Sequence, residues 1–239
     1  MDEIALFLDL DGTLAPIELN PAMVVLPAGT TAILAKLAER MSGALAIVSG
    51  RSDSELDRLL HPLKLPFAAC HGTIVRDASG AIASRALARE GVVRMTKAAH
   101  KALGKHEGIV IEAKDGGVAI HYRSCPQNGP LCRSVAQHIS GVIPNTYCQS
   151  GKMVVEIVPN GVSKGNAIKH LLATSPFLGR IPVFAGDDLT DETGFSAVND
   201  SSGISIKVGT GSTSARWRLA GTEAVTIWLS GLLTRTASR

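Results

Sequence analysis

The chain has 239 residues and a formal net charge of +3, from 24 Lys and Arg residues against 21 Asp and Glu residues. This weak charge and an aromatic content of 4% argue against a nucleic-acid-binding protein, which needs a basic surface and rings that stack on bases. With 45% hydrophobic residues the chain is not disordered, and its length lies between one and two average domains of about 150 residues.

The cysteines and the N-terminus indicate the cellular compartment of the protein. The chain contains four cysteines: Cys70, Cys125, Cys132 and Cys148. None belongs to a C-x-x-C pair, which argues against a zinc or redox motif and favours buried thiols in a reducing compartment. The acidic start MDE lacks the positive region of a signal peptide, and no apolar run reaches the ~18 residues of a membrane span. We therefore expect a cytoplasmic protein that makes no membrane contact.

The first 72 residues alternate between short apolar runs and helical patterns. A helix is predicted over residues 28–41, where apolar side chains recur at helical spacing, and another begins at Ser52 or Asp53. Short continuous apolar runs, typical of buried parallel strands, occupy residues 4–10, 44–48 and 67–70. The alternation predicts a parallel sheet covered by helices on both faces.

The pattern changes after this region and returns near residue 160. Between them we predict helices over 92–103 and 131–139, strands over 108–112, 118–122 and 153–158, and a hairpin turn at 114–117. After Ser163 we predict helices over 165–172, 193–198 and 223–233 and strands over 183–185 and 204–208. The chain is therefore expected to form an α/β core of residues 1–84 and 161–239, interrupted by a smaller inserted α+β domain of residues 85–160.

Three of the predicted core strands end in polar residues. Asp9 and Asp11 follow the first strand, Ser49 follows the second, and Asp187 and Asp188 follow a later one. Ligands of open α/β sheets bind beyond the carboxyl ends of the strands, so these residues are expected to meet at one site. Each cluster alone could also simply start a helix. Four carboxylates together would repel one another without a divalent cation, and oxygen ligands favour Mg²⁺.

This set of residue types suits phosphoryl transfer. A carboxylate can attack a phosphoryl group to form an aspartyl-phosphate, while a cation shields its charge. A second carboxyl group two residues away can protonate the leaving oxygen and then activate water. A hydroxyl, backbone N–H groups and a lysine can hold the phosphoryl oxygens. The chain offers these parts as Asp9, Asp11, Ser49-Gly50 and Lys164.

The motifs resemble those of known phosphatases. DLDGTL at 9–14, SGR at 49–51, Lys164 and GDDLTD at 186–191 stand in the order of the four motifs of the haloacid dehalogenase (HAD) superfamily. Nearly the whole chain also resembles the bacterial trehalose-6-phosphate phosphatase family. The similar stretches are FLDLDGTLAPI, GALAIVSGRS, IEAKDGGVAIHYR, VVEIVPNGVSKGNAI, GRIPVFAGDDLTDETGF and ISIKVGTGSTSARWRLAG. The resemblance implies a HAD-like Rossmannoid core with a parallel sheet and a mobile inserted cap that sets substrate specificity.

The resemblance also implies roles for individual residues. Asp9 would be the nucleophile and Asp11 the general acid/base, with Ser49 and Lys164 completing the catalytic set. Asp9, Asp187 and the main-chain carbonyl of Asp11 would bind Mg²⁺. The substrate would be held by Ser49, Gly50, Arg51 and Lys164 of the core and by Glu112, Lys114 and Glu156 of the cap. Without the resemblance, Glu112 and Lys114 are better explained as a solvated pair on one face of a strand.

The implied function is a Mg²⁺-dependent phosphatase that converts trehalose 6-phosphate to trehalose and phosphate, with a functional link to a trehalose-6-phosphate synthase. The alternative is a related HAD sugar phosphatase that acts on another hexose phosphate or on sucrose phosphate, because the core motifs are shared. An inactive sensor or a partner subunit for trehalose synthesis is disfavoured, because the nucleophile and the metal ligands are present.

One position departs from the family pattern. Ile74 stands where relatives usually carry Glu, while Arg76 keeps the register. The sequence assigns no role to His71, His121, Arg123 or Lys152, and does not say whether Asp188, Asp191 or Glu192 contacts the metal.

Overall fold

The structure is a computed structural model that describes residues 3–18, 20–114 and 116–234. The chain divides into two compact units, Met1–Ala83 with Ser163–Arg239, and Ser84–Val162. The second unit is therefore an insertion within the first. In the part of the chain that the structure describes, no helix has the length and apolar character needed to cross a membrane.

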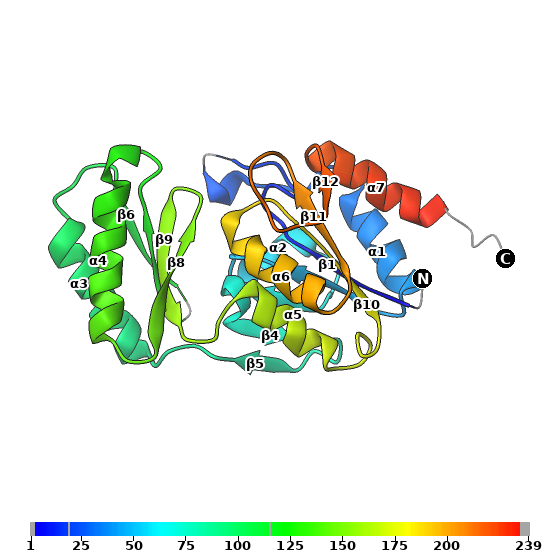
Figure 1. Ribbon diagram of the computed structural model, residues 1–239, viewed down its shortest axis with the longest axis horizontal. Helices are drawn as coiled ribbons and strands as arrows, with labels where there is room; N and C mark the ends of the chain where they lie inside the picture. Colours follow the sequence, from blue (N-terminus) through cyan, green and yellow to red (C-terminus); the bar gives the residue numbers. More distant parts are fainter. Residues whose placement is uncertain (1–2, 19, 115, 235–239) are drawn as a thin grey trace. The chain divides into compact units, whose positions relative to one another are not determined.

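The first unit is built on an eight-stranded sheet with the order β12-β11-β10-β1-β2-β3-β4-β5 (Figure 1). The strands are β1 (Ile4–Leu8), β2 (Leu45–Val48), β3 (Phe67–Ala69), β4 (Ile74–Arg76), β5 (Ile82–Ser84), β10 (Ile181–Gly186), β11 (Ile204–Val208) and β12 (Trp217–Leu219). All neighbours from β12 to β3 pair in parallel, whereas β4 runs antiparallel to β3. The predicted parallel α/β sheet is confirmed, with an antiparallel addition at one edge.

Helices cover both faces of this sheet, as the strand–helix alternation predicts. The crossovers from β1 to β2 and from β10 to β11 run toward opposite edges, and right-handed crossovers of opposite direction place their helices on opposite faces. These helices are α1 (Thr30–Arg40) and α6 (Glu192–Asp200). α1 packs against α7 (Thr222–Thr234), and α5 (Lys164–Leu172) packs against α6. The central strands β1 and β2 are consequently buried almost throughout.

Helix α2 (Asp53–Leu60) begins with a capping box at Ser52. The Glu55 backbone N–H donates to the Ser52 Oγ at 3.4 Å, and the Ser52 N–H donates to the Glu55 carboxylate at 3.1 Å. This arrangement satisfies two N–H groups that a helix start otherwise leaves without partners. It also fixes the Glu55 side chain, which contributes to the site described below.

The second unit is a four-stranded antiparallel sheet with the order β6-β7-β9-β8 (Figure 1). Its strands are β6 (Val110–Lys114), β7 (Gly117–His121), β8 (Thr146–Gly151) and β9 (Val154–Pro159). Helices α3 (Arg89–Leu103) and α4 (Gly129–Val142) pack on one face, where they form a separate apolar core with Val118, Ile120, Val155 and Ile157. The predicted α+β character of this region is confirmed.

Lys114 lies in a strand rather than in the predicted turn. The antiparallel ladder pairs it with Gly117, so the hairpin is tighter than the 114–117 turn of the prediction. Asp115 of that predicted turn lies outside the described residues.

Within the described residues, four strands were not predicted: β4, β5, β8 and β12. Three of them have three residues each, which is too short for a period to be recognised. β8 has the sequence TYCQSG and is half-buried along its whole length, so it presents neither an apolar run nor an apolar–polar alternation. Short 3-10 helices at Pro21–Met23, Cys70–Gly72, Pro126–Asn128 and Leu189–Asp191 complete the structure.

Candidate active site

Three aspartates, Asp9, Asp187 and Asp191, lie together at the carboxyl ends of β1 and β10 and are called the acidic group below. β1 and β10 are paired neighbours, and the Asp9 N–H extends their ladder by donating to the Ala185 carbonyl at 2.9 Å. Asp9, Asp187 and Asp191 each place a carboxylate oxygen within 4.8 Å of the others. Asp191 follows β10 in the 3-10 helix Leu189–Asp191. The structure thus brings the predicted Asp9 and Asp187 together and adds Asp191, whose part the sequence does not decide.

A buried lysine bridges two members of this group. Lys164, the first residue of α5, donates from Nζ to Asp9 Oδ1 at 2.7 Å and to Asp191 Oδ1 at 2.6 Å. Lys164 and Asp9 are 3% exposed, and Asp191 is fully buried. One ammonium group beside three carboxylates leaves an excess of negative charge, which a bound divalent cation would neutralise.

Burial and the neighbouring charges shift the pKa values of Asp9 and Lys164. Burial raises the pKa of Asp9 well above its ordinary value, and the neighbouring Asp191 and Asp187 carboxylates raise it further, against the opposing charge of Lys164. For Lys164, burial opposes the charged form, but Asp191 and Asp9 outweigh burial and raise its pKa above the ordinary range. A bound cation would favour the ionised form of Asp9.

The backbone around Asp187 requires glycine at position 12. Gly12 has a φ of 84°, in the left-handed region that glycine tolerates best. A Cβ at this position would overlap the Asp187 carboxylate. The glycine that follows Asp11 therefore lets the loop after β1 approach the end of β10 closely.

The carboxylate of Asp11 points to a different partner. Arg51 donates from Nε to Asp11 Oδ2 at 2.7 Å and from Nη2 to Asp11 Oδ1 at 2.8 Å. The same guanidinium donates to Glu55 Oε1 at 2.9 Å and to the Pro21 carbonyl at 3.0 Å. The two hydrogen bonds from Arg51 to Asp11 form a bidentate fork. Because the Arg51 side chain is only 6% exposed, this fork fixes the orientation of the Asp11 carboxylate. The structure thus gives Arg51, predicted as a substrate contact, a second task that the sequence does not reveal.

We expect Arg51→Met to slow the hydrolysis of a sugar phosphate far more than that of p-nitrophenyl phosphate. The resemblance implies that Asp11 gives a proton to the leaving oxygen, and a poor alkoxide leaving group depends on that proton. Without Arg51, Asp11 loses the side chain that fixes its position. A misplaced catalytic group costs about 10²-fold, so kcat for the sugar phosphate should fall by about that factor. The exposed Arg58→Met in α2 is the matched control. Equal losses with both substrates would contradict a positioning role.

Ser49, Gly50 and His71 meet at the end of β2. Ser49 is buried, and its Oγ accepts a hydrogen bond from the Arg51 N–H at 3.2 Å. The His71 N–H donates to the Ser49 carbonyl at 2.9 Å, and a Cβ at Gly50 would overlap the His71 ring. His71 therefore packs directly on the loop predicted to hold the phosphoryl group, and any side chain at position 50 would require its ring to move.

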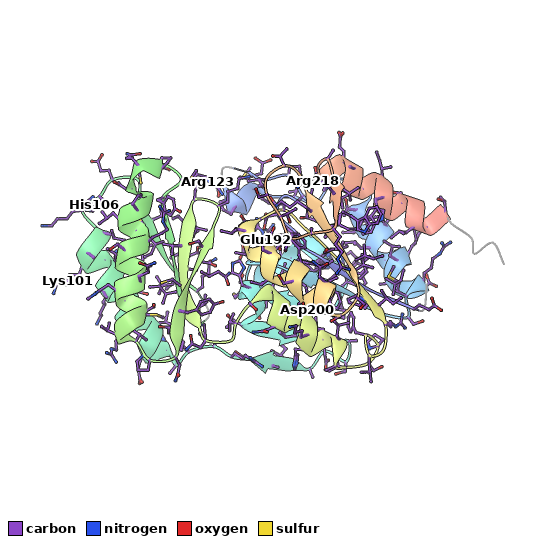
Figure 2. All side chains as sticks on the ribbon, in the orientation of Figure 1. Lys101, His106, Arg123, Glu192, Asp200 and Arg218 are labelled. Carbon is purple, nitrogen blue, oxygen red and sulfur yellow. The ribbon has the colours of Figure 1, made fainter. Side chains whose placement is uncertain are left out.

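Glu192 does not join the acidic group. It stands at the start of α6 (Figure 2) and accepts hydrogen bonds from Ser214 N at 2.8 Å, Ser214 Oγ at 2.7 Å and Thr213 Oγ1 at 2.7 Å. Burial opposes ionisation, but the Ser214 and Thr213 donors outweigh it and lower the pKa of Glu192. The carboxylate thus holds the 213–214 loop against α6.

We expect Glu192→Gln to lower the free energy of unfolding by about 1 kcal/mol at neutral pH. A carboxylate with a lowered pKa stabilises the fold above its unfolded pKa of about 4.3 and loses this effect as the pH falls through its folded pKa. The difference between variant and wild type should therefore vanish near pH 3. Urea unfolding at both pH values measures this, with the exposed Glu223→Gln in α7 as the matched control. An equal difference at both pH values would contradict the assignment.

The remaining predicted residues lie on one face of the sheet in the inserted unit. The register aligns Glu112, Ala119 and Glu156 across β6, β7 and β9. Lys114 Nζ donates to Glu156 Oε1 at 2.7 Å, and His121 Nε2 lies 2.8 Å from Glu112 Oε2. Glu156 is only 4% exposed. Because the Glu156 carboxylate is buried, the Lys114–Glu156 ion pair is not a solvated surface pair. The two side chains form a partly buried polar cluster.

Other predicted or open positions lie elsewhere in the structure. Arg123 is exposed in the turn after β7 (Figure 2), and Lys152 is exposed in the turn between β8 and β9. Ile74 is buried in the apolar core of the first unit. Arg76 binds both oxygens of Asp57, at 2.9 and 3.0 Å, and has a structural role.

Known proteins share this sequence and fold. The chain matches the trehalose-phosphatase family over residues 7–223. It is 45% identical over 234 residues to the trehalose-6-phosphate phosphatase of Escherichia coli (strain K12), covering 96% of this chain and 86% of that protein. It is 37% identical to a probable trehalose-phosphate phosphatase of Sinorhizobium fredii, covering 87% and 79% of the two chains.

A solved structure shows the same architecture. The crystal structure of a trehalose-6-phosphate phosphatase related protein superposes with a TM-score of 0.77 at 30% identity, covering 96% of each chain. Both the sequence match and the superposition extend over both units. The chain therefore belongs to the trehalose-phosphatase family and has the fold of the HAD superfamily.

Proposed function

We propose that the chain is a Mg²⁺-dependent phosphatase that hydrolyses trehalose 6-phosphate to trehalose and phosphate. The observation that carries this proposal is the buried Asp9 at the end of β1, set against Lys164 and within 4.8 Å of two further carboxylates. A carboxylate in this position is suited to attack an anionic phosphoryl group, provided that positive charge surrounds both partners. The named relatives act on the same substrate class.

The acidic group fits a divalent cation. Its three ligand atoms are all carboxylate oxygens, the type that Mg²⁺ prefers. The pKa of Asp9 is raised mainly by burial and further by the Asp191 and Asp187 carboxylates, and a cation would oppose both effects. Asp9, Asp187 and the main-chain carbonyl of Asp11 would hold the ion, and Asp191 would orient Lys164. A bound Mg²⁺ would supply charge neutralisation for the attack on phosphorus.

Hydrolysis would then proceed in two steps, carried out by residues of the first unit. An oxygen of Asp9 attacks phosphorus, and the bond from phosphorus to the sugar oxygen breaks as Asp11 gives that oxygen a proton. Asp11 next takes a proton from water, whose oxygen attacks phosphorus. The bond to Asp9 breaks, and phosphate leaves. Ser49 and Lys164 hold the phosphoryl oxygens during both steps.

The inserted unit, Ser84–Val162, is proposed to act as a cap that selects the sugar. Glu112, Lys114 and Glu156 offer charged donors and acceptors, which form the strongest hydrogen bonds to hydroxyl groups. Their common sheet face and the burial of Glu156 support this role. The predicted specificity domain of residues 85–160 falls within this unit.

A cytoplasmic location and a synthase link are part of the same proposal. All four cysteines are free thiols, which suits a reducing compartment. The substrate must be supplied by an enzyme that joins a sugar to a sugar phosphate, so the phosphatase would act next to a trehalose-6-phosphate synthase.

We expect Lys114→Ala to lower kcat/KM for trehalose 6-phosphate by about 10- to 100-fold, because a charged hydrogen bond to the sugar and to Glu156 is lost. Hydrolysis of glucose 6-phosphate, which lacks the second sugar, should change little. Lys101→Ala on the exposed face of α3 (Figure 2) is the matched control. Wild-type preference for glucose 6-phosphate or sucrose phosphate would contradict the proposed substrate.

A further inference from the structure

The polar face of the sheet in the inserted unit extends beyond the residues that the motifs identify. On the opposite face, alternate side chains pack against α3 and α4. On the polar face, the register sets one residue of each strand in a single row: Glu112, Ala119, Glu156 and Gln149. Gln149 of β8 is therefore the cross-strand neighbour of Glu156.

The amide of Gln149 has one end without a partner. Its Oε1 accepts a hydrogen bond from the Tyr147 hydroxyl at 3.0 Å. Its Nε2 is buried, and among residues 3–18, 20–114 and 116–234 it has no hydrogen-bond partner. Buried amide groups in native proteins are rarely left in this state, and each case requires an explanation.

The orientation of the amide depends on the Tyr147 hydroxyl. This hydroxyl donates to Gln149 Oε1 and also contacts the Val162 carbonyl, and its single proton can serve only one acceptor at a time. In the orientation that accepts from Tyr147, Nε2 is the end of the amide without a partner.

Tyr147 and Gln149 belong to the same cluster as Glu156. Burial raises the pKa of the Tyr147 phenol, and the nearby Glu156 carboxylate raises it further. Glu156 also binds Lys114 at 2.7 Å. The unpaired amide end therefore lies beside groups already suited to hydroxyl recognition.

We propose that Gln149 is a further specificity-determining residue, whose unpaired amide end hydrogen-bonds a sugar hydroxyl of the substrate while Tyr147 orients the amide. This inference rests on the proposed function. A sugar hydroxyl both donates and accepts, so it satisfies the amide in either orientation. The ligand class is a polyhydroxylated sugar, and phosphoryl chemistry in the first unit does not depend on this contact.

The test compares two substrates in Gln149→Met, which keeps the length of the side chain and removes the amide. We expect kcat/KM for trehalose 6-phosphate to fall about threefold to tenfold, mainly through KM, as for the loss of one hydrogen bond. Hydrolysis of p-nitrophenyl phosphate should be unchanged. Gln149→Asn, which withdraws the amide by one carbon, should show the same selective loss if the first variant folds poorly.

The control is Gln137→Met, the same substitution on the exposed surface of α4. Unchanged kinetics for trehalose 6-phosphate in both Gln149 variants would overturn the inference and would indicate that a water molecule fills the position. Equal losses with both substrates would also overturn it, because they indicate a structural role. A wild-type protein that hydrolyses p-nitrophenyl phosphate but not trehalose 6-phosphate would instead overturn the proposed function, and the inference with it.

Discussion

Asp9→Asn is expected to abolish phosphate release while leaving the fold intact. The amide has nearly the same shape as the carboxylate, and its oxygen can still accept the hydrogen bond from Lys164 at 2.7 Å. Its NH₂ group takes the place of the oxygen that accepts from Thr13 at 3.1 Å and can donate to the Thr13 hydroxyl instead. The amide cannot form the bond to phosphorus, however, and loss of a nucleophile in other hydrolases lowers kcat by roughly 10⁴- to 10⁶-fold. Initial rates of phosphate release and thermal unfolding of the variant measure the two parts of this expectation.

A matched control is Asp200→Asn, at the exposed end of α6 (Figure 2). Asp200 lies 3.7 Å from Lys169 in a surface ion pair, which contributes little to stability. This variant should retain wild-type rates. Phosphate release by Asp9→Asn at the wild-type rate would contradict nucleophilic attack by Asp9.

Lys164→Met is expected to lower the free energy of unfolding by about 3–5 kcal/mol in the absence of divalent cations. The substitution removes the buried ammonium that binds Asp9 and Asp191, and three close carboxylates then lack their counter-charge. Activity should be lost as well. The destabilisation should shrink as the pH falls, because protonated carboxylates no longer repel one another. Urea unfolding at neutral and at acidic pH, with a chelator present, measures the effect.

Added Mg²⁺ should restore more stability to Lys164→Met than to the wild type, because the ion replaces part of the missing positive charge. Lys169→Met in the same helix is the control, since its side chain is half-exposed. An unfolding free energy of Lys164→Met equal to that of the wild type would contradict the role of Lys164 as the counter-charge of the acidic group.

The positions of the polar residues proposed for catalysis could be predicted because local sequence determines them. The strands that became β1, β2 and β10 are apolar runs that end at Asp9, Ser49 and Asp187, and parallel strands end at the same edge of a sheet. The partners of these residues could not be predicted. Arg51 reaches Asp11 across forty positions of sequence, and that pairing depends on the directions of two loops.

The side-chain contacts of the aspartates in the segment GDDLTD, residues 186–191, could not be predicted either. All three of its aspartates have the same chemistry, so the residue types alone do not say which one faces Lys164. The 3-10 turn Leu189–Asp191 decides this, because it brings Asp191 Oδ2 to the Asp188 N–H at 2.8 Å and Oδ1 to Lys164. Turn geometry of this kind is not encoded in hydrophobic periodicity.

The polar cluster of the inserted unit shows where sequence patterns carry no signal. Lys114 and Glu156 meet only because β6, β7 and β9 pair in one particular antiparallel register. Gln149 lies on the unpredicted strand β8, whose polar sequence resembles a loop. The roles of Glu112, Lys114 and Glu156 in sugar binding stay predictions, which rest on the family resemblance and on this common face.

The most direct test of the central claim is the initial rate of phosphate release from trehalose 6-phosphate, measured with Mg²⁺ and with a chelator. Glucose 6-phosphate and sucrose phosphate serve as comparison substrates. We predict rapid release from trehalose 6-phosphate with Mg²⁺, little release from the other two, and loss of activity on chelation that Mg²⁺ restores. Equal activity with the chelator, or faster hydrolysis of either comparison substrate, would contradict the account.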